Sequence, residues 1–152
     1  MKIDGNPAGR VEYADNDASG GEGCNAGDSD AGVTVVVCSS CRDAQGSDIR
    51  PSAGERLGVA TAQAACRTGI TVRQIECLGN CKRRLSAALL RDGCWSYVFG
   101  DLTQDSGPDL IAGASLLAAS TDGVLPWRGR PDSLKRGLVA RIPPLHLLKD
   151  PS

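Results

Sequence analysis

The chain has 152 residues, a formal net charge of −1 and seven cysteines. Its length suits one compact domain with unstructured ends rather than two domains. The near-zero net charge argues against nucleic acid as a partner, because phosphate binding requires a clear cationic surplus. The sequence has no run of roughly 18 apolar residues and no signal-peptide core, so we expect a cytoplasmic protein without a membrane partner.

Cytoplasmic thiols are kept reduced. The cysteines are therefore interpreted as metal ligands or redox groups rather than as a disulfide framework. Aromatic residues make up only 3% of the chain, and the apolar residues are mainly Ala, Val and Leu. This composition predicts helices packed on a Val-rich sheet, which is an α/β fold.

The first half of the chain predicts a tail followed by a strand and a helix. Residues 1–31 are rich in Gly, Asp, Asn, Ala and Ser, and we expect a disordered acidic tail. The run VTVVV at 33–37 is typical of a strand buried on both faces. Ser52 and Glu55 have the spacing of a capping box, which predicts that a helix begins there and continues over 53–67.

The second half predicts a further strand at 70–75, a β-hairpin from 85–90 and 94–99, and a last helix that begins near Pro108. The predicted order is β-α-β-β-β-α, a two-layer arrangement of one sheet and its helices. We therefore divide the chain into a disordered acidic tail, one domain and a basic Pro/Arg-rich C-terminal extension, over residues 1–31, 32–124 and 125–152.

Two cysteine pairs follow the first two predicted strands. Cys38 and Cys41 form a CxxC pair directly after the first strand, and Cys77 and Cys81 form a CxxxC pair after the second. A right-handed β-α-β crossover makes these strands parallel, so both pairs are expected at the same edge of the sheet. Four thiolates at these spacings are suited to one metal or iron–sulfur centre, with basic neighbours compensating their charge.

The other cysteines and the single histidine are not expected at this centre. Cys24 lies in the predicted tail, whereas Cys66 and Cys94 are interpreted as packing residues, although Cys94 lies near the predicted site. His146 lies in the apolar stretch PPLHLL, where a packing or surface role is favoured. The chain offers no persuasive catalytic set, so we do not expect an enzyme.

The chain resembles a bacterial family of uncharacterised, predicted metal-binding proteins in the segments VCSSCR (37–42), ECLGNCKR (76–83), WSYVFGDL (95–102) and LPWRGRP…LKRGLVARIPPL (125–145). This family is often encountered beside cobalamin-biosynthesis genes and is related to the thioredoxin-like [2Fe–2S] ferredoxins. The resemblance implies a thioredoxin-like fold, with a [2Fe–2S] cluster held by Cys38, Cys41, Cys77 and Cys81. The first pair is spaced more tightly than in the ferredoxin subunit of complex I.

Three functions follow for this quartet. The leading hypothesis is a [2Fe–2S] protein that carries single electrons, and family association alone links it to cobalamin metabolism. A zinc-binding or metal-handling Cys₄ module is the first alternative, because tetrahedral thiolate sites also suit Zn²⁺. A thiol–disulfide oxidoreductase is the second, because a CxxC after a strand is the thioredoxin position; residues 66–90, however, contain no proline to supply the cis-proline of thioredoxins.

The C-terminal segment is basic, and we expect it to dock a redox partner protein. Its density of positive charge favours an acidic partner that is steered electrostatically. A solvated segment that only aids solubility, or an intramolecular contact with the acidic tail, would carry the same charge pattern. The residues concerned are Arg128, Arg130, Lys135, Arg136 and Arg141.

Overall fold

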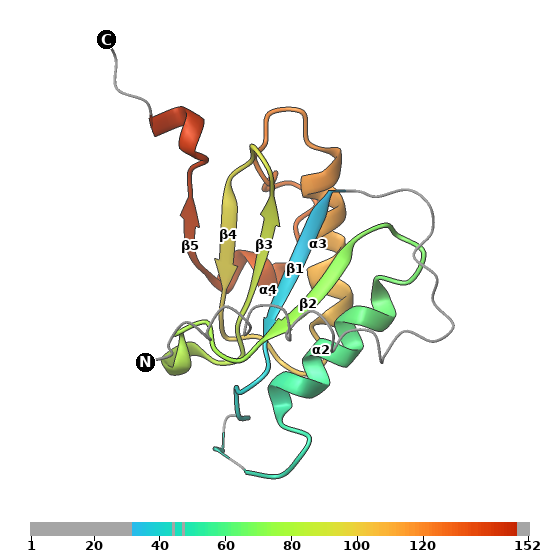
Figure 1. Cartoon of the computed structure of the whole chain (residues 1–152), viewed down its shortest axis with the longest axis vertical. Helices are drawn as coiled ribbons and strands as arrows, with labels where there is room; N and C mark the ends of the chain where they lie inside the picture. The colour runs from blue at the N-terminus through green and yellow to red at the C-terminus, as the bar shows by residue number, and fades with distance from the viewer. Residues whose placement is uncertain (1–31, 44, 47, 149–152) are drawn as a thin grey trace, which may run out of the picture.

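The computed structural model describes residues 32–43, 45–46 and 48–148. The predicted acidic tail, residues 1–31, lies outside the described residues. The elements are, in chain order, β1 (Val33–Cys38), α2 (Ala53–Ala64), β2 (Thr71–Ile75), η3 (Cys81–Arg83), β3 (Ala87–Arg91), β4 (Ser96–Phe99), α3 (Gly107–Ala119), α4 (Asp132–Arg136), β5 (Leu138–Ile142) and η4 (Leu145–Leu148) (Figure 1).

The strands form one five-stranded mixed sheet in the order β2-β1-β3-β4-β5. β1 and β2 are parallel, whereas β3, β4 and β5 each lie antiparallel to the preceding strand of the sheet. A β-α-β unit followed by a hairpin and a helix, in this strand order, is the thioredoxin-like topology. The predicted α/β fold class is confirmed.

The core lies between the sheet and the helices α2 and α3, which contact each other and β1 (Figure 1). Val33, Val35 and Val37 alternate along β1 and are at most 1% exposed. Thr34 and Val36 point to the opposite face and are only half-buried. The prediction that β1 is buried on both faces is therefore wrong for this second face, because α2 and α3 both pack on the first.

Helix α2 begins at the predicted capping box. The Ser52 hydroxyl accepts a hydrogen bond from the Glu55 backbone N–H at 3.1 Å, and the Glu55 carboxylate accepts one from the Ser52 N–H at 3.2 Å. The regular helix ends at Ala64, three residues before the predicted end, because Arg67 adopts a left-handed backbone conformation with φ 67°. No helix in the described ranges is long and apolar enough to cross a bilayer.

The fifth strand comes from the segment that the sequence analysis assigned to the C-terminal extension. β5 pairs antiparallel with β4, which adds a strand to the four that were predicted. Leu125 and Leu134 of the same segment are at most 1% exposed, so this segment is part of the core. The strand was missed because four of its five residues are exposed, and an edge strand of this kind lacks the apolar alternation that predicts strands.

Arg130 is also buried, and this corrects its assignment to a docking surface. Its side chain is held by the carbonyl oxygens of Leu125 at 2.7 Å and Pro126 at 3.2 Å. The guanidinium carbon lies 5.8 Å from the Tyr97 ring centroid and 5.1 Å from that of Trp127. Burial lowers the pKa of Arg130, and the residue joins the C-terminal segment to the core.

Candidate metal centre

The two segments that hold the predicted cysteine ligands are hydrogen-bonded to each other. Cys38 pairs with Ile75 at the end of the parallel β1–β2 ladder. The backbone N–H groups of Ser39 and Ser40 then donate to the carbonyls of Ile75 at 2.8 Å and Glu76 at 3.1 Å. Both cysteine pairs therefore follow strands that end at the same edge of the sheet, at its lower end in Figure 1, as predicted.

The N-terminus of α2 fixes the first pair from the other side. The Ser52 hydroxyl donates to the Ser39 carbonyl at 2.6 Å, and the Gly54 N–H donates to the Cys41 carbonyl at 2.9 Å. A Cβ at Gly54 would lie only 2.2 Å from the Cys38 carbonyl oxygen. Only glycine allows this approach, so Gly54 contributes to the site even though the sequence analysis did not single it out.

Cys38 and Cys41 form a buried, hydrogen-bonded thiol pair. Their exposed fractions are 2% and 6%. The hydrogen bond from Cys41 lowers the pKa of Cys38 to about 5, against an opposing effect of burial, and the Leu78 backbone N–H assists. The same hydrogen bond, together with burial and the charge on Cys38, raises the pKa of Cys41. The two thiols therefore differ in acidity, and Cys38 is the more acidic of the pair.

The second pair differs from the first, because Cys77 and Cys81 are both exposed. The Gly79 backbone N–H donates to the Cys77 sulfur at 3.2 Å. Gly79 has a φ of 76°, a conformation that favours glycine and that turns the chain between the two cysteines. Cys81 is the first residue of η3. The exposed pair therefore lies on a short glycine-containing loop rather than in the core.

An electrostatic effect and a hydrogen bond from Asn80 connect the segments around the two pairs. Charge on Cys81 contributes to the raised pKa of Cys41, and the Ser86 backbone N–H opposes it. The Asn80 side-chain amide, between the exposed cysteines, donates to the Ser86 hydroxyl at 2.9 Å. Ser86 and Asn80 were not identified from the sequence, where neither has a motif that marks it.

The donor set fits a metal or an iron–sulfur cluster in its chemistry. Four free thiols lie on adjacent loops, and backbone N–H groups donate to the sulfurs of Cys38, Cys41 and Cys77. Such N–H···S bonds stabilise metal-bound thiolates. In the described part of the chain, no three Cys, His, Asp or Glu side chains are grouped as a metal ion requires. Cys38 and Cys41 are buried, whereas Cys77 and Cys81 are exposed, so the four thiols are not gathered around one point.

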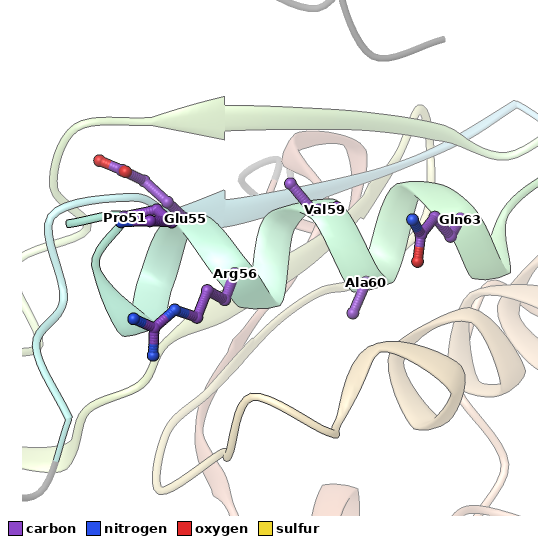
Figure 2. A pocket seen from close by; sticks show the side chains of 6 residues that line it. All are labelled: Pro51, Glu55, Arg56, Val59, Ala60 and Gln63. Carbon is purple, nitrogen blue, oxygen red and sulfur yellow. The ribbon is translucent and has the colours of Figure 1, made fainter. Parts of the chain in front are cut away.

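Cys94 lies in the turn between β3 and β4, beside the start of β1, whereas Cys38 lies at the end of β1, so the expectation that Cys94 lies near the site is wrong. Cys94 is half-buried and packs against the core, and the Arg91 guanidinium donates to its sulfur at 3.8 Å. Cys66 is disulfide-bonded, which corrects the interpretation that it is a packing thiol. Neither of two surface hollows is lined by a cysteine of the quartet. One, of about 490 Å³, borders Cys94 and His146. The other, of about 270 Å³, lies on the outer side of α2 beside Val59 and Ala60 (Figure 2).

A thioredoxin-like [2Fe–2S] ferredoxin from Aquifex aeolicus is similar over 72% of this chain and 91% of its own chain, with 11% identity and a TM-score of 0.46. No curated protein matches the chain. Residues 35–144 match the family described as "Protein of unknown function (DUF1636)", and this match confirms the family resemblance that the motifs indicated. The chain therefore belongs to the DUF1636 family.

Proposed function

We propose that Cys38, Cys41, Cys77 and Cys81 hold a [2Fe–2S] cluster and that the protein carries single electrons. The observation that supports this proposal most strongly is the hydrogen bonding of Ser39 and Ser40 to Ile75 and Glu76, which makes the two cysteine-bearing loops neighbours. Four thiolates on two adjacent loops are the ligand set of such a cluster.

The buried and the exposed cysteine pairs contribute to the proposed cluster site in different ways. The α2 N-terminus and β2 position the buried pair, so Cys38 and Cys41 provide a preorganised half of the site. The loop with Gly79 brings Cys77 and Cys81 from the solvent side. The bound cluster would supply one-electron redox chemistry, and the N–H groups of Leu78, Gly79 and Ser86 would tune it by hydrogen bonding to the sulfurs.

A thiol–disulfide oxidoreductase is the second candidate. The hydrogen bond between Cys38 and Cys41 favours it, because the pKa of Cys38 falls to about 5 and a thiolate is the attacking species. Burial opposes it, because Cys38 is only 2% exposed, and attack on a substrate disulfide requires access to the sulfur. The role also leaves Cys77 and Cys81 without a function.

Anaerobic purification followed by iron, sulfide and zinc analysis tests the proposal. We expect a coloured protein with about two irons and two sulfides per chain, and a visible spectrum that bleaches on one-electron reduction. A colourless protein with one zinc per chain would instead identify the Cys₄ zinc module. A metal-free protein that reduces a model disulfide would identify the oxidoreductase. The cytoplasmic location and the link to cobalamin metabolism both stay predictions.

A further inference from the structure

A basic surface adjoins the exposed cysteine pair. Cys81, Lys82 and Arg83 form η3, so Lys82 follows an exposed thiol directly in one turn. The Arg84 side chain folds back and donates from Nε to the Cys81 carbonyl at 3.2 Å. It also donates from a terminal nitrogen to the Asp43 carbonyl at 3.2 Å. Arg84 therefore bridges the two loops that carry the cysteine pairs.

A residue far away in the sequence joins the same corner. Arg83 donates to the Arg136 carbonyl at 3.4 Å, and the Gly100 N–H donates to the Gly137 carbonyl at 2.7 Å. A Cβ at Gly137 would lie 2.4 Å from the Gly100 carbonyl oxygen, which shows how closely these segments approach. The end of α4, and with it Arg136, therefore lies beside η3.

The charges at this corner are largely uncompensated. Arg83 is paired with Asp101 at 2.7 Å. Lys82, Arg84 and Arg136 are exposed, and among the described residues none of the three has a carboxylate within salt-bridge distance. The exposed acid nearest in sequence to the exposed cysteines is Glu76. We name the surface of Lys82, Arg84 and Arg136 the η3 basic surface.

The remaining basic residues of the C-terminal segment do not extend this surface in the same way. Arg130 is 7% exposed and belongs to the core. Lys135 and Arg141 lie over the rings of Trp127 at 5.2 Å and Trp95 at 4.5 Å. Arg128 is exposed, and the structure places no hydrogen bond or ion pair between it and another described residue. It provides a control with the same charge.

We propose that the η3 basic surface docks an acidic redox protein, which exchanges electrons with the centre through the side that exposes Cys77 and Cys81. This inference rests on the proposed function, and it moves the predicted docking site from the whole C-terminal segment to η3 and Arg136. Charge-steered contacts of this kind raise the association rate of transient partners. The positive charges of the η3 basic surface adjoin the segment that carries Cys77 and Cys81, the two exposed thiols of the quartet.

The first experiment needs no metal. In the full, metal-free chain, Cys77 and Cys81 are labelled with an anionic and a cationic methanethiosulfonate reagent, and mass spectrometry gives the two rates at each residue. Because both reagents react with the same thiol, the ratio of the anionic to the cationic rate does not depend on the intrinsic reactivity of that thiol. It depends on the local electrostatic potential. We expect the anionic reagent to be preferred, and the double variant Lys82→Glu/Arg84→Glu to lower the ratio at least about threefold. Arg128→Glu is the matched control.

The second experiment uses the metal-loaded protein and an acidic flavodoxin as the probe. At low ionic strength the double variant should transfer electrons at least about tenfold more slowly than the native chain, and salt should reduce this difference. Arg128→Glu should react like the native chain. An unchanged labelling ratio, or an electron-transfer rate that the double variant does not lower, would overturn the docking proposal. Iron content and the visible spectrum report separately on the proposed function.

Discussion

Gly54 lies so close to Cys38 that a Cβ at position 54 would be 2.2 Å from the Cys38 carbonyl oxygen. This contact fixes the N-terminus of α2 against the loop that holds the buried cysteine pair. In an open helix, Gly→Ala stabilises by up to about 1 kcal/mol. Here we expect Gly54→Ala to lower the free energy of unfolding by about 1–3 kcal/mol and to weaken metal retention, measured by urea denaturation and metal analysis.

Gly107→Ala provides the control for this prediction. A Cβ at Gly107 would lie 2.7 Å from the Ala60 carbonyl carbon, so the substitution also creates a clash with α2 but far from the cysteines in sequence. Gly107→Ala should destabilise the fold and leave the metal content per folded chain unchanged. Equal loss of metal in both variants would show that Gly54 acts through general stability alone.

The burial difference between the two cysteine pairs predicts their reactivity. In the metal-free chain, a neutral alkylating reagent should modify Cys77 and Cys81 much faster than Cys41, because only the first two are exposed. Metal binding should protect Cys77 and Cys81, since the exposed loop then closes on the metal. Quantitative mass spectrometry of alkylated peptides measures both effects. Labelling of the exposed pair at the same rate with and without bound metal would contradict the proposed closure.

The opposite pKa shifts of Cys38 and Cys41 predict a pH dependence of stability in the reduced, metal-free chain. The pKa of Cys38 is lowered to about 5 in the folded chain, whereas a cysteine in the unfolded chain has a pKa of about 8.5. Between these values the unfolded chain binds one more proton than the folded chain, so this contribution to the free energy of unfolding increases with pH. It is lost as the pH falls through the folded value.

Above about pH 8.5 the raised pKa of Cys41 reverses the slope, because the folded chain then keeps a proton that the unfolded chain has lost. Urea denaturation from pH 5 to pH 10 measures this curve, and Cys38→Ala removes the contribution. If the difference in stability between the native chain and Cys38→Ala did not change with pH, the lowered pKa of Cys38 would be refuted.

The burial of Arg130 predicts a structural role. Its removal leaves the carbonyls of Leu125 and Pro126 without their donor and empties a stacked position between two aromatic rings. Arg130→Ala should lower the free energy of unfolding by about 2–4 kcal/mol, whereas the exposed Arg128→Ala should change it by less than about 0.5 kcal/mol. Calorimetry or urea denaturation compares the two. If the two substitutions lowered the free energy of unfolding equally, Arg130 would not have this structural role.

Local signals in the sequence predicted the β-α-β unit well. The β-branched run at 33–37 became β1, and the Ser52–Glu55 spacing became an observed capping box. The parallel pairing of β1 with β2 followed from handedness, and it correctly placed the two cysteine-bearing segments at one edge. The strand and the helix cap depend on residues that are close in the sequence. The parallel pairing depends on the right-handedness of β-α-β crossovers.

Contacts between distant segments were not predictable from the pattern. β5 has four exposed residues of five, so its pairing with β4 is not marked by alternation. Arg130 is a charged residue in a basic segment, and its burial depends on packing against Tyr97, which lies in β4, distant in the sequence. The role of Gly54 likewise appears only when α2 is packed on the loop after β1.

We propose that Cys38, Cys41, Cys77 and Cys81 act together as ligands of one metal centre. The most direct measurement is iron per chain in anaerobically purified Cys81→Ser beside Cys94→Ser, since Cys81 belongs to the quartet and Cys94 packs against the core. We expect Cys94→Ser to keep the iron of the native chain and Cys81→Ser to lose most of it. Native iron content in Cys81→Ser, together with its loss in Cys94→Ser, would contradict the account.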